Sequence, residues 1–152
     1  MEAVERIIQN VREKYAGKDV YEICEKEGII IHRAEMQDDC EGFYLPLEEG
    51  RVILLRADLP SQVEREVIAH ELYHHFAGVN EDFQSTEGRK FLEIVPYFKE
   101  ENHANAFAVL LLCPDITDCS AVVDIMYKYD CSKVSAKLRR KLEEQMRAKG
   151  MI

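Results

Sequence analysis

Tryptophan is absent from this 152-residue sequence, and proline (4 residues), glycine (7) and cysteine (5) are scarce. So little proline and glycine, in a chain that is 47% hydrophobic and 32% charged, excludes a disordered or low-complexity protein. The five cysteines are odd in number and contain no C-x-x-C pair, which excludes a disulfide framework and a zinc site built from cysteines. Unpaired cysteines are typical of a reducing compartment, so we expect a cytoplasmic protein.

Long apolar runs and an excess of positive charge are missing as well. The longest apolar run, Ala106–Cys113, is far shorter than the roughly 18 residues that span a bilayer, and the first six residues lack the layout of a secretion signal. We therefore expect no membrane association. The formal net charge is −9, although residues 132–152 alone carry +5. Because an acidic surface repels phosphate, we expect a basic protein partner and no direct nucleic-acid binding.

The spacing of apolar residues predicts helices, then a small sheet, then more helices. The expected helices cover residues 2–15 and 19–26, and the expected strands cover 29–32, 42–45 and 51–55, with a hairpin turn over 46–50. The remainder is expected to be mainly helical. This order predicts a single compact α+β domain, in which a three-stranded antiparallel or mixed sheet packs with about five to six helices. Residues 1–114 are expected to form the core, and 115–152 to form C-terminal helices packed on it.

A longer helix is predicted to begin at Ser61. The Ser61 hydroxyl can cap this helix, and Glu64, three residues later, can complete a capping box. The helix should continue to Ala77, with Gly78 as its C-terminal stop. Its inward stripe, at helical spacing, consists of Val63, Val67, His70 and His74.

Two of those stripe residues belong to the motif His70-Glu71-Leu72-Tyr73-His74, which has the form H-E-x-x-H. One helical turn separates His70 from His74, so both imidazoles can bind one zinc ion. Glu71 lies about 100° round the helix from His70, beside the metal, where its carboxylate can act as a base on water. Two unpaired buried imidazoles would cost free energy, which also favours a metal site. We expect one Zn²⁺ per chain.

A catalytic zinc needs a third protein ligand and an open position. The extended motif with a third histidine fails, because Ala77 and Asn80 occupy the required glycine and histidine positions. A later helix, predicted over residues 100–113 with an acidic first turn, offers a glutamate instead. Glu101 can bind the metal from that helix, and Asn105, one turn further on, can hydrogen-bond the imidazole of His70.

Other residues compete for the ligand role. His103 is a rival because imidazole binds zinc well, but its predicted face is that of Phe107 and Leu110. Glu100 is adjacent to Glu101 and is a second alternative. His32 and His75 are expected to be ordinary surface or boundary histidines.

The H-E-x-x-H motif is followed, 27 residues after His74, by Glu101-Asn102-His103-Ala104-Asn105-Ala106-Phe107-Ala108, and then by an aliphatic run and Pro114. This pair of motifs resembles the ImmA/IrrE family of metallopeptidases, whose second motif is E-x-x-A-N-x-F-A followed by an aliphatic pair and a proline. The stretch over residues 50–59 also matches the strand and polar turn that precede H-E-x-x-H in the family. The resemblance covers roughly residues 1–140 and is strongest over 50–114.

The resemblance implies a zincin-like, specifically gluzincin-like, α+β fold. It implies that His70, His74 and Glu101 are zinc ligands and that Glu71 is the catalytic base. It also implies an endopeptidase that cleaves a helix-turn-helix (Xre-like) repressor of a mobile element, such as a phage, or of a stress regulon. The sequence departs from the family at Tyr73, where glycine is usual, at His103, where an acid is common, and at Cys113, where methionine is common. Residues 124–138 resemble the family's helix-turn-helix stretch, and we expect them to pack on the core.

These observations lead to the hypothesis of zinc-dependent peptide hydrolysis, with Glu71 moving the proton. Tyr73, Tyr97 and His103 are candidates for stabilising the transition state. An extended substrate can pair with the predicted edge strand near residues 42–45. One alternative is a non-catalytic, zinc-containing domain that binds a regulatory partner, and another is a DNA-binding module that uses the basic C-terminal stretch.

Overall fold

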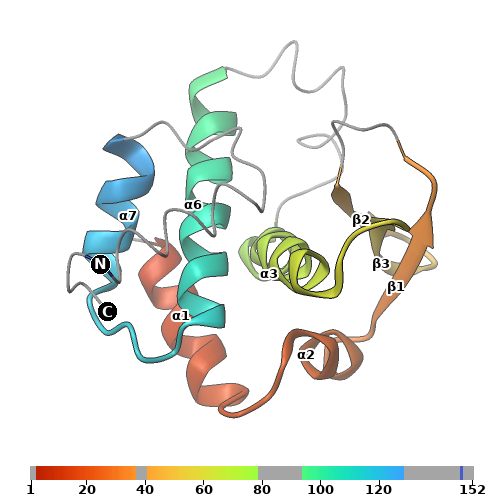
Figure 1. The fold of residues 1–152 in the computed structure, drawn as a ribbon, viewed down its shortest axis with the longest axis horizontal. Helices are drawn as coiled ribbons and strands as arrows, with labels where there is room; N and C mark the ends of the chain where they lie inside the picture. The colour runs from red at the N-terminus through yellow and green to blue at the C-terminus, as the bar shows by residue number, and fades with distance from the viewer. Residues whose placement is uncertain (1–2, 37–40, 79–93, 129–147, 149–152) are drawn as a thin grey trace.

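The computed structural model of the chain describes residues 3–36, 41–78, 94–128 and 148. Within these residues it contains five helices and one three-stranded sheet. In chain order the elements are α1 (Ala3–Lys14), α2 (Val20–Lys26), β1 (Ile29–Ala34), β2 (Gly42–Leu47), β3 (Gly50–Arg56), α3 (Ser61–Ala77), α6 (Ile94–Leu112) and α7 (Cys119–Lys128). Figure 1 shows the sheet to one side of α3, and α1, α6 and α7 to the other. The predicted α+β class is confirmed.

The sheet is mixed, with strand order β1-β3-β2. β1 runs parallel to β3 and β2 runs antiparallel to it, so that Ile31 and Tyr44 both lie opposite Ile53. The β2–β3 turn is tighter than predicted, because the ladder continues to the pair Leu47–Gly50. Pro46 is tolerated within β2 because β2 lies at the edge of the sheet.

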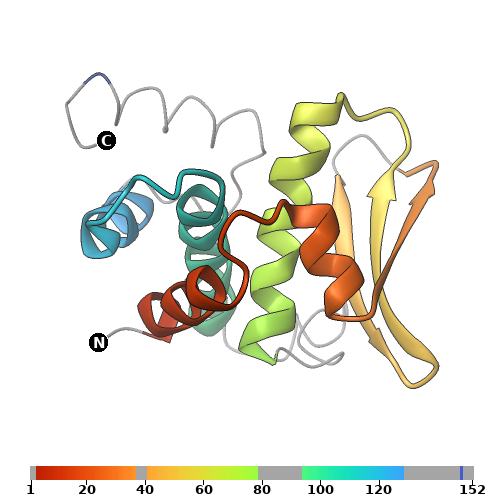
Figure 2. The same cartoon turned by 90° about the horizontal axis from the view of Figure 1, so that it is seen from below.

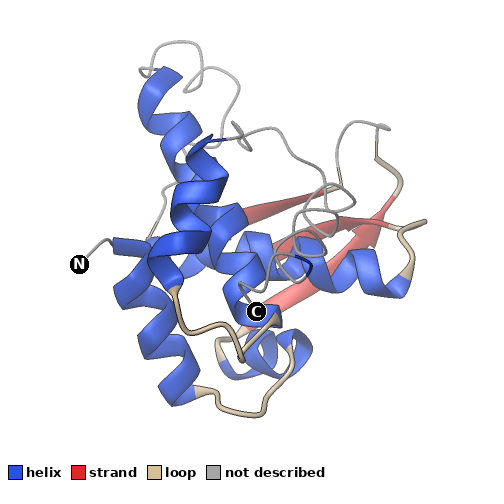
Figure 3. Cartoon of the chain, turned by 60° about the vertical axis from the view of Figure 1, so that its left-hand side comes forward, coloured by secondary structure: helices blue, strands red, loops and turns tan. Residues whose placement is uncertain are grey.

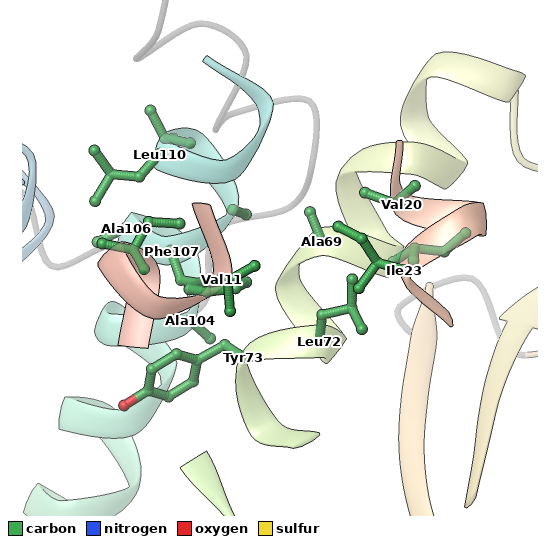
Figure 4. Close-up of a cluster of buried hydrophobic side chains, with 14 of the residues drawn as sticks. Val11, Val20, Ile23, Ala69, Leu72, Tyr73, Ala104, Ala106, Phe107 and Leu110 are labelled. Carbon is green, nitrogen blue, oxygen red and sulfur yellow. The ribbon is translucent and has the colours of Figure 1, made fainter. Parts of the chain in front are cut away.

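The core lies on one face of the sheet, where α3 and α2 pack (Figure 2). Buried side chains of the sheet, including Tyr44, Ile53 and Leu55, belong to the same apolar cluster as the helices. Figure 4 shows how α3 divides this cluster: Ala69 and Leu72 lie towards Val20 and Ile23 of α2, whereas Tyr73 projects towards α6. A second view of the helices in front of the sheet is given in Figure 3.

β2 approaches α3 closely at Gly42. A Cβ atom added at this position would lie 2.6 Å from Cγ1 of Val67 and 3.1 Å from the carbonyl oxygen of Leu54. Only glycine, which has no side chain, fits between the strand and the helix here.

The bounds of α3 match the prediction, but its N-cap does not. Gly78 follows the helix in the left-handed conformation (φ 71°) and donates its N–H to the last turn, as predicted. The N-cap is Pro60 and no side chain caps the helix, so the predicted roles of Ser61 and Glu64 were wrong. The Glu64 carboxylate instead accepts hydrogen bonds from the guanidinium of Arg33 and the hydroxyl of Tyr21. Two hydrogen bonds from one guanidinium hold a carboxylate more strongly than a single hydrogen bond from a backbone N–H does.

α6 begins at Ile94, six residues earlier than predicted, so the expected acidic first turn is wrong and Glu101 lies in the helix interior. Pro96 is tolerated because it sits in the first turn, where backbone N–H groups have no partner within the helix. At the other end, Nη2 of Arg12 in α1 donates to the carbonyl oxygens of Leu110 (2.8 Å) and Cys113 (3.4 Å). This cation satisfies terminal carbonyls of α6.

α7 packs against α6, with Val122 and Met126 buried. The second predicted C-terminal helix lies outside the described residues, so the helix-turn-helix comparison and the boundary at residue 114 stay predictions. No helix in the described ranges is both long enough and apolar enough to cross a membrane.

The Arg33–Glu64 ion pair generates a testable prediction about stability. The hydrogen bonds from Arg33, the largest effect, lower the pKa of Glu64 below its usual range. A carboxylate with a lowered pKa stabilises the fold above its unfolded-state pKa of about 4.3, and that contribution is lost as pH falls through the lowered value. We expect Glu64→Gln to reduce the free energy of unfolding by about 1–2 kcal/mol at neutral pH, measured by urea denaturation.

Glu22→Gln is the matched control, because the Glu22 side chain is exposed and its ion pair among the described residues is with the exposed Lys18, at 3.5 Å. Its loss should change stability by about 0.5 kcal/mol or less. The difference between wild type and Glu64→Gln should shrink near pH 3. A difference that stays constant down to that pH would contradict the assigned role of the ion pair.

Candidate metal centre

Helices α3 and α6 bring three candidate ligands to one point. His70 and His74 follow one another by a turn of α3, are 8% and 4% exposed, and have ring centroids 5.4 Å apart. Their Nε2 atoms lie 3.1 Å and 3.0 Å from the two carboxylate oxygens of Glu101 on α6. One ligand atom from each residue lies within 4.8 Å of the others. Among the described residues, these three form the group that could hold a metal ion.

The protonation of the cluster suits a cation. Burial acts to raise the pKa of Glu101, but the charges and hydrogen bonds of His70 and His74 outweigh it and hold the pKa well below the usual range. Glu101 is therefore a carboxylate, the form that binds a metal. Two imidazole nitrogens and one carboxylate are also a donor set that zinc accepts, and three protein ligands leave one position open. The residues fit the metal that the sequence predicts.

Asn105 lies one turn beyond Glu101 and orients His70. Its Oδ1 is 2.9 Å from Nδ1 of His70, and the Asn105 side chain is fully buried. Because an amide oxygen only accepts, Nδ1 of His70 is the donor. Nε2 of His70 is then the nitrogen that faces Glu101, to which it donates at 3.1 Å, and after loss of that proton it is free to bind a metal.

Glu71 lies on α3 directly after His70 and is 8% exposed. It is not part of the three-residue group. Its role as a base stays a proposal.

Tyr73 and His103 form a buried pair between α3 and α6. Both are at most 2% exposed, and the Tyr73 hydroxyl lies 3.4 Å from Nδ1 of His103. The Tyr73 ring also packs against His74 and Phe107. The structure thus places the rival ligand His103 against Tyr73 and outside the metal group. The side chains of Tyr97 and Glu100 lie outside the described residues.

His75 is part of a polar chain that sequence reasoning missed. Arg51 donates to the Tyr44 hydroxyl (3.0 Å), which contacts Nδ1 of His75 (2.8 Å), and Nε2 of His75 contacts Oε1 of Glu27 (2.9 Å). Glu27 also accepts hydrogen bonds from Tyr15 and Lys14. Burial acts to raise the pKa of Glu27, but these hydrogen bonds lower it. This series of hydrogen bonds connects the last turn of α3 to β2, β3 and the end of α2. His32, in contrast, is exposed on β1, as predicted.

Local periodicity carries no signal for such a chain, because its members come from segments far apart in the sequence. The amphipathic pattern of α3 placed His75 at a boundary, which is correct, but it said nothing about the partners that the fold supplies.

Comparison with protein families identifies the chain. The model of the IrrE N-terminal-like domain, Peptidase_M78, matches residues 24–138. Comparisons with curated proteins and with solved structures gave no match. The matched range covers well over half of the chain, contains the whole metal group and extends into α7. The resemblance inferred from the two motifs is confirmed: the chain belongs to the IrrE N-terminal-like domain family of peptidases.

Proposed function

We propose that this protein is a zinc-dependent endopeptidase with a zincin-like active site, in which His70, His74 and Glu101 hold one Zn²⁺. Membership of a peptidase family supports hydrolysis of peptide bonds, and the convergence of the three side chains supports a metal centre. Zinc is favoured over other metals by the mixture of imidazole and carboxylate ligands and by their number. The observation that carries the proposal is the pair of contacts from Glu101 to the two histidines.

Bound zinc would polarise the scissile carbonyl and lower the pKa of water at its open position. Glu71 takes the proton from the attacking water and delivers it to the nitrogen of the leaving amine. Asn105 holds His70 in the tautomer that keeps Nε2 turned towards Glu101. Each step thus has a residue of this chain assigned to it, and the hydrolysis consumes one water per peptide bond.

Stabilisation of the transition state has three candidates, Tyr73, Tyr97 and His103. Tyr73 and His103 contact one another in the interface between α3 and α6. Either side chain would have to leave this pair to reach a substrate carbonyl, so the role remains a prediction for both. The role also stays a prediction for Tyr97, whose side chain lies outside the described residues.

The substrate is proposed to bind as an extended strand along β2. β2 packs against α3, and in the described sheet its one partner is β3, on the side away from the sheet edge. Addition of a strand to such an edge gives affinity through backbone hydrogen bonds that do not depend on sequence. Residues 42–45 are the part of β2 proposed for this contact.

The protein substrate is proposed to be a helix-turn-helix (Xre-like) repressor of a mobile element or a stress regulon. Support comes from the family resemblance and from charge: the chain carries −9, whereas a DNA-binding repressor presents a basic surface. The proposal places the enzyme in the cytoplasm with its substrate.

The first prediction concerns metal content. The purified protein should contain one zinc per chain, measured by elemental analysis, and His70→Ala, His74→Ala and Glu101→Ala should each bind zinc at least about 100-fold more weakly in competition with a chelator. His32→Ala is the matched control, because His32 is exposed on β1. Full zinc affinity in any of the three site variants would remove that residue from the proposed ligand set.

The second prediction concerns Asn105. Asn105→Ala should lower zinc affinity by about 10–100-fold, because the imidazole of His70 loses the acceptor that fixes its orientation. Asn105→Asp should restore most of the affinity, since a carboxylate oxygen accepts the same hydrogen bond. Chelator competition measures affinity, and thermal unfolding of the metal-free proteins shows whether the variants fold. Equal losses in both variants would contradict a role through the hydrogen bond.

The third prediction separates catalysis from metal binding. Glu71→Gln should retain one zinc but cleave a repressor encoded beside this protein's gene at least about 100-fold more slowly, because glutamine cannot accept the proton. Cleavage is followed by gel electrophoresis and mass spectrometry, with Glu13→Gln, an exposed change on α1, as control. Unchanged cleavage by Glu71→Gln would overturn the mechanism. A wild-type protein that binds zinc and the repressor without cleaving it would instead support a non-catalytic regulatory domain.

A further inference from the structure

The face of the sheet that points away from α3 is apolar. Side chains alternate between the two faces of a strand, and Tyr44, Ile53 and Leu55 already point to the core. The opposite face carries Ile30, Leu45, Leu47, Val52 and Leu54, which we call the outer apolar face. None of these five belongs to the buried cluster or to the partly buried side chains packed against it.

Strand register makes this face continuous. Ile30 of β1 and Leu45 of β2 both lie opposite Val52 of β3, so three apolar side chains form a row across the sheet. In the next row Leu54 lies between Phe43 of β2 and the exposed His32 of β1, so His32 marks the polar margin of the face. Ile30 is 61% exposed and Leu47 is 39% exposed, and these two are the exposed large apolar side chains among the described residues. A contiguous apolar patch on a protein surface marks an interaction site more often than isolated exposed residues do.

The described helices leave this face uncovered. α2 and α3 are the helices that pack on the sheet, and Figure 2 shows both on its other side. The metal group lies farther away still, between α3 and α6. The outer apolar face therefore lies on the side of the sheet away from the metal group, and it shares Leu45 with the strand proposed to pair with a substrate; the inference does not rest on the proposed function.

Charges at the ends of this face select the partner. Glu48 and Glu49 are exposed in the β2–β3 turn, and Glu35 is exposed just after β1, at the opposite end. Arg56, the cation nearest to that end, pairs with Asp58 at 2.7 Å. An apolar surface with acidic ends, on a chain of net charge −9, complements an apolar surface with basic ends.

A second copy of the chain fits this surface poorly, because face-to-face pairing would set acidic ends against acidic ends. The seven residues of β3 extend over about 23 Å, the length of a helix of about 15 residues. We propose that the outer apolar face binds an amphipathic helix of a partner protein, with an apolar stripe of about four turns and Lys or Arg at its ends. This is recognition of a helix by an apolar surface, with charge setting the choice of partner.

The test uses the zinc-loaded full chain and two synthetic 15-residue helical peptides. One carries a leucine stripe and lysines, and the other carries the same stripe and glutamates. Fluorescence anisotropy measures affinity, and amide NMR shifts locate binding. We expect the lysine peptide to bind at least about tenfold more tightly than the glutamate peptide, with shifts in β1, β2 and β3.

Ile30→Asp and Leu47→Asp should each weaken binding of the lysine peptide by at least about tenfold. Both positions are exposed, so the variants should fold and retain zinc. Ala16→Asp, in the exposed turn between α1 and α2, adds the same negative charge elsewhere and should leave affinity unchanged.

Several results would overturn the inference. These are absence of peptide binding, shifts confined to other surfaces, and equal losses in Ile30→Asp and Ala16→Asp. Sedimentation of the protein alone is the last arm: self-association that Ile30→Asp abolishes would show that a second copy, and not a partner helix, covers the face. Zinc content is measured in every arm, so failure here is distinguishable from failure of the metal centre.

Discussion

The partly buried carboxylate of Glu101, shared between two imidazoles, is the constraint on which the remaining structure depends. Placing one carboxylate and two imidazoles out of water costs free energy unless their charges are matched. A slide of α3 past α6 by one residue, about 1.5 Å, would break the contacts of 3.0 and 3.1 Å. Contacts outside the site also fix the positions of the two helices.

The chain holds each helix with an arginine. Arg33 of β1 donates two hydrogen bonds to Glu64 in the first turn of α3, and Arg12 of α1 donates to a carbonyl near the end of α6. The chain of hydrogen bonds from Tyr44 through His75 to Glu27 fixes the last turn of α3, directly beside His74. Polar contacts thus fix the ends of the two helices, while burial of the apolar cluster between them supplies most of the stabilisation.

The sequence predicted those features that depend on neighbouring residues. The bounds of α3, the left-handed Gly78 and the strand positions follow from local periodicity and backbone preference. The meeting of Glu101 with the H-E-x-x-H helix was predicted from motif spacing and family resemblance. What was missed depends mainly on distant residues, because the partners of Glu64 and His75 come from other elements. The start of α6 was missed as well, because the acidic residues at 100 and 101 are typical of a first helical turn.

Gly42 carries a consequence for how the protein can change. Val67, which a side chain at position 42 would strike, lies one turn before His70 on the same stripe of α3. The absence of a single methyl group therefore sets the spacing between the strand proposed to align a substrate and the helix proposed to hold the metal. A homologue with any other residue here would need a smaller residue at position 67 or a wider spacing between β2 and α3.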